Sequence, residues 1–269
     1  MDHRNRIVER FEADDTAIGA RATVVSPTLV EVYGSIGLDF TWIDLEHTGP
    51  APTDSPAIEE LTRSAEVGGI DLLVRIPASD PHVVRKLLDA GVRNVLIPRV
   101  ETAAEVESIV AASRFVYDGA PGERGNAAGR SAVWGSASEN YVEREDKSTC
   151  VGVMIENETA VENVEEILSV PDLGFVFVGP SDLSVSLGCP LETDHPDVRS
   201  AIESIRTAAL DADVPVGCIA NDPASASVAI EEGYQLLRIG DEVSAARTIL
   251  GERVASIRTD GTGTVTDER

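Results

Sequence analysis

The sequence predicts an α/β protein built as one TIM (β/α)8 barrel, and two observations favour this fold. Short apolar runs typical of buried strands alternate with amphipathic helical segments, and eight such units can be counted. The length of 269 residues also suits a single barrel, which usually needs about 250 residues. We therefore expect a barrel domain over residues 1–256 and a flexible tail over residues 257–269.

Each predicted strand is a short, mostly apolar run. In chain order the strands are Thr16–Val25, Phe40–Asp44, Asp71–Arg75, Asn94–Ile97, Val151–Ile155, Phe175–Val178, Val214–Cys218 and Leu236–Ile239. Runs of this length between turn residues are consistent with strands that are buried on both faces.

Apolar residues at helical spacing mark the segments between these strands, most clearly in Asp80–Ala90 with its Val-Val and Leu-Leu pairs. In chain order the predicted helices are Pro27–Gly34, Ser55–Val67, Asp80–Ala90, Thr102–Ser113, Val161–Leu168, Pro223–Glu232 and Val243–Arg253. One connection, Arg114–Ser148, is long and rich in Gly and Ala, and loops of this length are usually functional or mobile.

The charge of the chain excludes several kinds of partner. Asp and Glu total 47 against 22 Lys and Arg, which gives a formal net charge of −25. Such a surface repels phosphate groups, so we expect no nucleic acid and no anionic membrane as partner. The acidic residues are spread along the chain and there are only two lysines, Lys86 and Lys147, a pattern that favours a halophilic source.

No apolar run is long enough to span a membrane, and the charged N-terminus lacks the apolar centre of a signal peptide. We therefore expect a soluble, cytoplasmic protein. The three cysteines, Cys150, Cys189 and Cys218, have neither the even count nor the spacing of a disulfide framework.

Two carboxylates follow neighbouring predicted strands and suggest a metal site. Glu156 directly follows Val151–Ile155, and Asp182 lies in the Gly-Pro-Ser-Asp turn after Phe175–Val178. The carboxyl ends of barrel strands meet on the face that carries the active site. Each acid alone could instead cap the following helix, but the pair favours a shared hard cation such as Mg²⁺ or Mn²⁺. The backbone N–H groups of the same turn, which begins at Gly179, would suit a small carboxylate.

Asp44, Glu46 and His47 end the second predicted strand. Of the four histidines in the chain, only His47 lies at the carboxyl end of a strand with acids beside it. We interpret His47 as a base or proton shuttle whose tautomer a carboxylate fixes, and we count Asp44 among the catalytic residues. The alternative is a polar histidine of a surface loop.

Arg75 ends the third predicted strand after three apolar residues, so its guanidinium must face the barrel mouth or an internal partner. Its fork of donors suits a carboxylate or the oxygen of a developing enolate. The alternative is an internal ion pair with Asp44 or Glu46.

A cation, an arginine, a histidine and a backbone anion site together favour the chemistry of 2-oxo acids. Such a substrate could chelate the cation, while the cation and Arg75 stabilise the enolate. A Schiff-base lysine is the rival route to the same carbanion. Lys86 lies on a predicted helix and Lys147 in a polar segment, so neither is placed in the barrel interior.

The residues above form motifs that resemble the HpcH/HpaI aldolase family, which are class II, metal-dependent pyruvate aldolases of the 4-hydroxy-2-oxoheptanedioate and 2-dehydro-3-deoxyglucarate types. The resemblance covers Gly19 to Ala246. Its motifs are Arg75, Glu156 and the strings Phe40–Gly49, Leu87–Gly91, Ile97–Val100 and Phe177–Ser184.

The resemblance implies an aldolase that cleaves a 4-hydroxy-2-oxo acid to pyruvate and an aldehyde through a metal-stabilised enolate. It implies that Glu156 and Asp182 bind Mg²⁺, Mn²⁺ or Co²⁺. Arg75 would hold the keto oxygen of pyruvate, and the amides of Ser181 and Asp182 would hold its carboxylate.

The resemblance also implies a homo-oligomer, usually a hexamer built as a trimer of dimers that exchange the last helix. In that assembly His47 would pair with Asp89 of a neighbouring subunit and deprotonate a metal-bound water. Arg124, in the Gly-x-Arg-Gly core of the family loop, is a candidate substrate contact. The chain departs from several members at Met154, where they have glutamine, and this change concerns the acceptor pocket more than the metal site.

Two other functions stay open at this point. One is a lyase that acts on a CoA thioester, as in the citrate-lyase β-subunit branch, although the acidic chain offers no obvious basic groove for the CoA phosphates. The other is a catalytically silent barrel that serves as an oligomeric binding protein.

Overall fold

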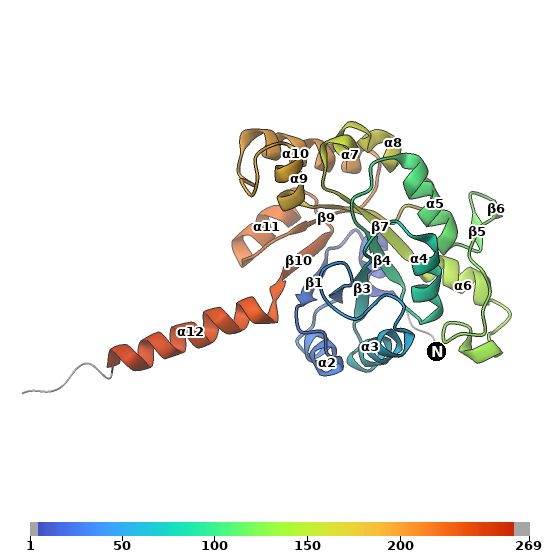
Figure 1. The fold of residues 1–269 in the computed structure, drawn as a ribbon, viewed down its shortest axis with the longest axis horizontal. Helices are drawn as coiled ribbons and strands as arrows, with labels where there is room; N and C mark the ends of the chain where they lie inside the picture. Colours follow the sequence, from blue (N-terminus) through green and yellow to red (C-terminus); the bar gives the residue numbers. More distant parts are fainter. Residues whose placement is uncertain (1–4, 261–269) are drawn as a thin grey trace, which may run out of the picture.

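Parallel strands close into a barrel that helices surround, as the computed structural model, which describes residues 5–260, shows (Figure 1). The strands of the barrel are β1 (Ala17–Ala22), β2 (Phe40–Asp44), β3 (Asp71–Arg75), β4 (Asn94–Ile97), β7 (Cys150–Ile155), β8 (Phe175–Val178), β9 (Val216–Ile219) and β10 (Leu236–Asp241). Their order around the barrel is β1-β10-β9-β8-β7-β4-β3-β2, and neighbouring strands are parallel. The predicted TIM barrel is confirmed, and each of its strands overlaps a predicted apolar run.

Helices follow the strands, and those before the last one surround the barrel. They are α2 (Pro27–Ser35), α3 (Ser55–Gly68), α4 (Pro81–Asp89), α5 (Ala103–Ser113), α6 (Tyr141–Ser148), α7 (Glu158–Glu162), α8 (Val164–Leu168), α9 (Pro180–Ser186), α10 (Pro196–Asp211), α11 (Pro223–Glu231) and α12 (Glu242–Asp260). The predicted helix Val161–Leu168 is in fact divided between α7 and α8, because Asn163 ends one helix and begins the other.

The long connection after α5 contains a two-stranded antiparallel hairpin, β5 (Val116–Tyr117) with β6 (Ala120–Pro121), and then α6. Sequence periodicity did not identify α6, because only Tyr141 and Glu145 of this helix are buried.

Three phenylalanine rings fill the barrel interior beside strands that have glycine at the facing position. A Cβ atom on any of these glycines would lie within 2.6 Å of a ring atom. The facing pairs are Gly19 with Phe40, Gly152 with Phe175, and Gly217 with Phe177. All three rings are fully buried, and burial of each contributes about 1.5–3 kcal/mol. The barrel is therefore a packed core, and a site can form only above this aromatic layer.

An N-terminal helix that periodicity did not predict, α1 (Arg6–Glu12), closes the amino end of the barrel. Ile7 is fully buried in the interior cluster, and the ring of Phe11 lies 6.2 Å from that of Phe175. The side chain of Asn5 donates hydrogen bonds to Oδ1 of Asn94 at 2.6 Å and to a backbone carbonyl at 2.7 Å. With the amino end closed, the opposite end is the entrance to the barrel.

The last helix, α12, extends away from the barrel instead of packing along it (Figure 1). Large apolar side chains on this helix are exposed, namely Ile249, Leu250, Val254 and Ile257. The helix includes residues 257–260, which we had expected in the flexible tail; the rest of that predicted tail, residues 261–269, lies outside the described part of the chain. Within residues 5–260, no helix is long and apolar enough to cross a bilayer.

Candidate active site

The structure brings most of the predicted site residues to the carboxyl end of the barrel. Asp44 and Arg75 are the last residues of β2 and β3, and Glu156 directly follows β7. Gly179 directly follows β8, and Asp182 lies in the first turn of α9. Because all these strands are parallel, their carboxyl ends share one face, as the sequence predicted.

Arg75 lies at the centre of this face and forms the internal ion pairs that we gave as the alternative. Its Nε and Nη2 atoms donate to the two carboxylate oxygens of Asp44 at 3.0 and 2.6 Å. Its Nη1 atom lies 2.9 Å from Oε2 of Glu46. Burial alone would raise the pKa of Asp44, but the bonds from Arg75 and the amides of Glu46 and His47 outweigh it and hold that pKa below its ordinary value. Asp44 therefore fixes the orientation of the Arg75 fork.

Glu46 connects the remaining charged groups at the mouth, a role that sequence analysis did not assign to it. Its buried carboxylate lies 3.5 Å from Nε2 of His47 and 3.5 Å from Nε of Arg99. The side chain of His47 is 55% exposed, so a substrate can reach it. Glu46 had been considered only as an ion-pair partner of Arg75. The signal that could have found it is its position two residues after Asp44, among the polar residues that end β2.

Glu156 is buried and one of its oxygens has no partner. Its Oε1 atom accepts a hydrogen bond of 2.8 Å from the backbone N–H of Arg99, whose φ of 56° is in the left-handed region. Its Oε2 atom is buried and has no hydrogen-bond partner among the described residues. Burial first, and then the negative charges of Asp182 and Glu46, raise the pKa of Glu156 to about 7. A buried carboxylate with an unbonded oxygen and a raised pKa can bind a cation at that oxygen.

Gly179 provides the space in front of Glu156. A Cβ atom at this position would lie 2.6 Å from Oε2 of Glu156. The N–H groups of Ser181 and Asp182, in the first turn of α9, have no acceptor within the helix. Asp182 itself is exposed on this face.

The chemistry of the donors suits a hard divalent cation. Glu156 and Asp182 offer carboxylate oxygens, which Mg²⁺ and Mn²⁺ prefer, and such ions often keep water or substrate as their other ligands. The unpartnered Oε2 of Glu156 and the open space at Gly179 are what such an ion would require. The residues present therefore fit the cation that the sequence predicted.

Met154, the departure from the family pattern, lies beside this site. Its side chain is buried, and its Sδ atom accepts a long contact of 3.9 Å from Nη1 of Arg75. A thioether is only a weak acceptor, so it leaves the arginine able to bind a stronger one.

Two predicted residues lie at the other end of their own barrel. Asp89 ends α4, which runs back to the amino end of β4, so it cannot pair with His47 of the same chain. Arg124 is buried against Glu145, with an Nη2–Oε2 distance of 2.8 Å, and against the ring of Phe115. It also lies beside Thr149, at the start of β7. Arg124 thus lies away from the mouth of its own barrel, and its role as a substrate contact stays a prediction.

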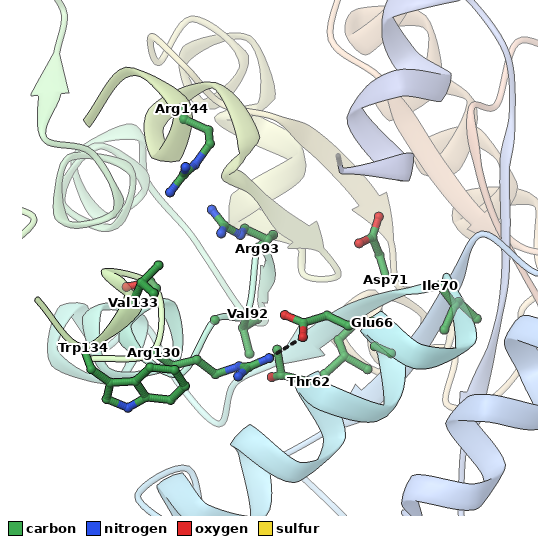
Figure 2. A pocket seen from close by; sticks show the side chains of 14 residues that line it. Thr62, Glu66, Ile70, Asp71, Val92, Arg93, Arg130, Val133, Trp134 and Arg144 are labelled. Carbon is green, nitrogen blue, oxygen red and sulfur yellow. Dashed lines mark hydrogen bonds and ion pairs between the residues drawn. The ribbon is translucent and has the colours of Figure 1, made fainter. Parts of the chain in front are cut away.

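A pocket at the amino end of β3 and β4 lies apart from the predicted site residues at the mouth. It is lined by Arg93, Arg130 and Arg144, and by the acids Glu66 and Asp71 (Figure 2). Arg130 is paired with Glu66, and the cavity of about 50 Å³ holds only a few water molecules. The site predicted from the sequence lies on the opposite face.

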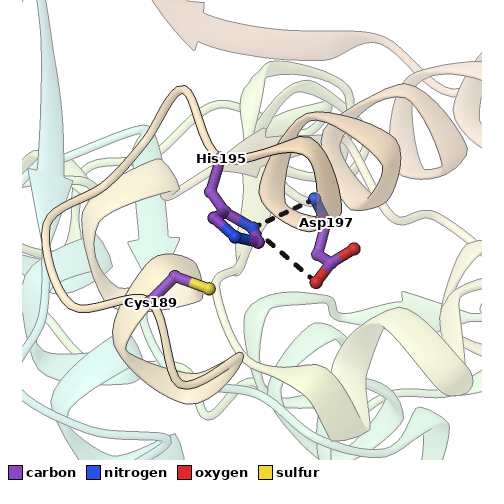
Figure 3. A group of neighbouring side chains, drawn as sticks. All are labelled: Cys189, His195 and Asp197. Carbon is purple, nitrogen blue, oxygen red and sulfur yellow. Dashed lines mark hydrogen bonds and ion pairs between the residues drawn. The ribbon is translucent and has the colours of Figure 1, made fainter.

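A second group outside the barrel mouth consists of Cys189, His195 and Asp197, with possible ligand atoms within 4.8 Å of one another (Figure 3). Nδ1 of His195 accepts a 3.3 Å hydrogen bond from the backbone N–H of Asp197 and so caps α10. His195 is the residue directly before the first turn of α10. Its ring therefore stabilises the helix.

Comparison with known proteins agrees with this geometry. A family model described as HpcH/HpaI aldolase/citrate lyase matches residues 22–248. The chain is 31% identical to a hydroxypyruvate/pyruvate aldolase of Cupriavidus necator, over 96% of this chain and 94% of that one. It is 31% identical to a 5-keto-4-deoxy-D-glucarate aldolase of Klebsiella pneumoniae, over 91% and 93%. The crystal structure of an HpcH/HpaI aldolase/citrate lyase family protein from Burkholderia cenocepacia matches with a TM-score of 0.87 at 31% identity, over 94% and 99%.

Proposed function

Because this chain belongs to the HpcH/HpaI aldolase/citrate lyase family, we propose that it is a class II aldolase that cleaves a 4-hydroxy-2-oxo acid to pyruvate and an aldehyde. In this reaction the 4-hydroxyl group loses its proton, the C3–C4 bond breaks, and the electron pair remains on C3 as the enolate of pyruvate. The enolate then takes up a proton at C3. The reverse reaction is an aldol addition.

The observation that carries the proposal is the buried, unpartnered Oε2 atom of Glu156 at the carboxyl end of a barrel strand. We infer that Glu156 and Asp182 hold a divalent cation of the Mg²⁺, Mn²⁺ or Co²⁺ type. Such a cation supplies Lewis-acid stabilisation of the charge that develops on the keto oxygen. The negative charge of Asp182 already acts on Glu156, which supports their closeness.

The protein itself then binds and orients the 2-oxo acid. Arg75, held in place by Asp44, donates to the keto oxygen, where charge develops in the transition state. The amides of Ser181 and Asp182 hold the carboxylate of the pyruvate half. This arrangement keeps C3 in a fixed position above the aromatic layer of the barrel.

His47 is the group that moves the proton. It is exposed at the mouth, and its Nε2 atom lies 3.5 Å from the carboxylate of Glu46. In cleavage it accepts the proton of the 4-hydroxyl group, and in the aldol direction it returns that proton to the product.

We further propose that the protein works as a homo-oligomer, a hexamer built from dimers that exchange α12. Support comes from the apolar side chains that α12 exposes and from the place of Asp89, at the opposite end of the barrel from His47 of its own chain. In that arrangement Asp89 of one chain orients His47 of its neighbour.

The test is the release of pyruvate from a 4-hydroxy-2-oxo acid. We expect turnover in the presence of Mg²⁺ or Mn²⁺, loss of turnover with EDTA, and recovery when the cation is restored. Glu156→Gln should remove activity by a factor of at least ~100, because one cation ligand is lost, whereas Glu162→Gln on the exposed face of α7 should leave it unchanged. Activity that survives both chelation and Glu156→Gln would overturn the proposal.

A further inference from the structure

Two arginines that the proposed mechanism does not use point into the barrel, Arg21 on β1 and Arg238 on β10. Along β10, Leu236 belongs to the interior cluster and Leu237 to the layer under the helices, so Arg238 points inward. Along β1 the same alternation places Ala17 inside and Ala20 and Ala22 outside, so Arg21 also points inward. The two strands are neighbours, and β1 also pairs with β2.

Three buried hydrogen-bond donors lie on the adjacent strands β10, β1 and β2. The Nε atoms of Arg21 and Arg238 and the indole Nε1 of Trp42 on β2 are all buried, and none has a hydrogen-bond partner in the described part of the chain. Trp42 is the neighbour of Arg21 in the register of β1 and β2. Buried donors are nearly always satisfied, so three on adjacent strands call for an acceptor that the chain does not supply.

The acids near these donors are already engaged. Asp44 binds Arg75, and Asp241 accepts hydrogen bonds from Ser244 at the start of α12 and lies 3.6 Å from Arg21. Over residues 5–260, no carboxylate forms an ion pair with Arg238. Burial and the positive charge of Arg21 lower the pKa of Arg238, the response of a cation that lacks an anion.

We propose that Arg21, Trp42 and Arg238 form a second anion-binding subsite, which holds a carboxylate at the far end of the acceptor aldehyde. The inference rests on the proposed aldolase function and adds the chemical class of its acceptor. A carboxylate offers two oxygens to a guanidinium fork and further lone pairs to an indole N–H.

The position of the subsite decides which half of the substrate carries the carboxylate that the subsite binds. The pyruvate half is held at β7 and β8 by the cation ligands and the first turn of α9. β10 is separated from β8 by β9, and β1 and β2 lie beyond it. A substrate bound at both places therefore extends across the mouth, with its acceptor half directed toward Arg21 and Arg238.

The test compares acceptors of similar size and different charge in the aldol direction, namely glyoxylate with glycolaldehyde, and glyceraldehyde 3-phosphate with glyceraldehyde. Arg238→Gln should lower kcat/KM for glyoxylate by about 10- to 100-fold, the loss expected when one hydrogen bond to a charged group is removed. It should change kcat/KM for glycolaldehyde by less than about threefold. Arg21→Gln should act in the same direction, and Arg238→Lys should retain part of the activity because it keeps the charge.

Two controls separate this inference from the function on which it rests. Exchange of the methyl protons of pyruvate in D2O reports enolate formation alone, and it should be the same in Arg238→Gln and wild type. Arg63→Gln, which alters an exposed arginine on α3, should leave both acceptors unchanged. Absence of exchange and of cleavage in the wild type would instead overturn the aldolase function.

Three kinetic outcomes would overturn the subsite. Equal losses for charged and neutral acceptors in Arg238→Gln would mean that the arginine only supports the fold. No loss for either charged acceptor would mean that it binds no part of the substrate. A larger loss for glyceraldehyde 3-phosphate than for glyoxylate would assign the site to phosphate.

As a readout independent of turnover, succinate should raise the melting temperature of the wild type and not that of Arg238→Gln, and a rise in both would also count against the subsite.

Discussion

At the scale of single residues, the site depends on one carboxylate with a partner missing. Glu156 lies in a buried position with one oxygen bound by the amide of Arg99, and the other has no hydrogen-bond partner within residues 5–260. A buried, unpaired acid is costly for a protein that binds nothing there. In a cation-binding protein the same arrangement is useful, because the ion replaces the solvent that the acid has lost.

The space in front of Glu156 leads to a first prediction. Gly179→Ala should abolish tight cation binding and lower activity by at least ~100-fold, because the new Cβ would lie 2.6 Å from Oε2 of Glu156. The backbone at Gly179 does not have a positive φ, so the effect is steric. Isothermal titration with Mn²⁺ measures it. Gly125→Ala, which meets no atom within 4 Å, is the matched control and should bind normally.

The raised pKa of Glu156 leads to a second prediction. Burial and two acidic neighbours raise this pKa from 4.5 to about 7, so below pH 7 the metal-free site holds a proton that a cation must displace. Mn²⁺ affinity should fall by up to about tenfold per pH unit below pH 7 and level off above it. Titrations between pH 5.5 and 8.5 would show this, and an affinity that is flat over the range would contradict it.

The raised pKa of Glu156 also determines how the stability of the metal-free protein depends on pH. A group whose pKa is higher in the folded state contributes stability below its ordinary value near 4.5 and loses it as the pH rises through about 7. The metal-free protein should therefore lose this stability as the pH rises from about 4.5 to about 7, and cation binding should offset that loss.

At the scale of elements, α1 shows that a short helix can close a barrel. Ile7 is its buried residue and fills the amino end together with the aromatic layer. Because this helix seals the interior, the mouth at the other end is the accessible face of the barrel.

The role of α1 gives a third prediction. Ile7→Ala should lower the free energy of unfolding by about 2–5 kcal/mol, the range for deleting most of a buried aliphatic side chain. Ile36→Ala, at a position that is 67% exposed, should change it by no more than about 0.5 kcal/mol. Chemical denaturation of both variants measures the difference, and similar losses would argue against the closing role of α1.

At the scale of the whole molecule, two features point to contacts with another copy of the chain. α12 exposes its apolar side chains to solvent, and Asp89 lies at the opposite end of the barrel from His47. Assembly of several copies would explain both, because α12 could then pack on a neighbouring barrel and Asp89 could reach a neighbouring mouth.

Assembly gives a fourth prediction. The double variant Leu250→Glu/Ile257→Glu should dissociate into smaller species and lose activity, because charges would replace exposed apolar side chains on α12. Light scattering after size exclusion measures the mass. Glu252→Gln, an exposed polar position on the same helix, should leave mass and activity unchanged. A wild type that is monomeric at micromolar concentration would contradict the assembly.

The sequence by itself determined the barrel and the face that carries its site. Alternating strand and helix periodicity identified the strands of the barrel, and a polar residue at the end of an apolar strand can face only the mouth or a buried partner, which located Asp44, Arg75 and Glu156. The resemblance to a known family added the reaction.

Only the tertiary structure decided how these residues are paired. The fork of Arg75 on Asp44, the links from Glu46 to His47 and Arg99, and the amide that holds Glu156 join residues far apart in the chain. The structure likewise placed Arg124 beside Glu145, away from the mouth of its own barrel, and placed Arg21 and Arg238 on neighbouring strands. The physical reason is that local periodicity fixes which face a side chain occupies, whereas its partners depend on strand order and register, which contacts across the whole chain determine.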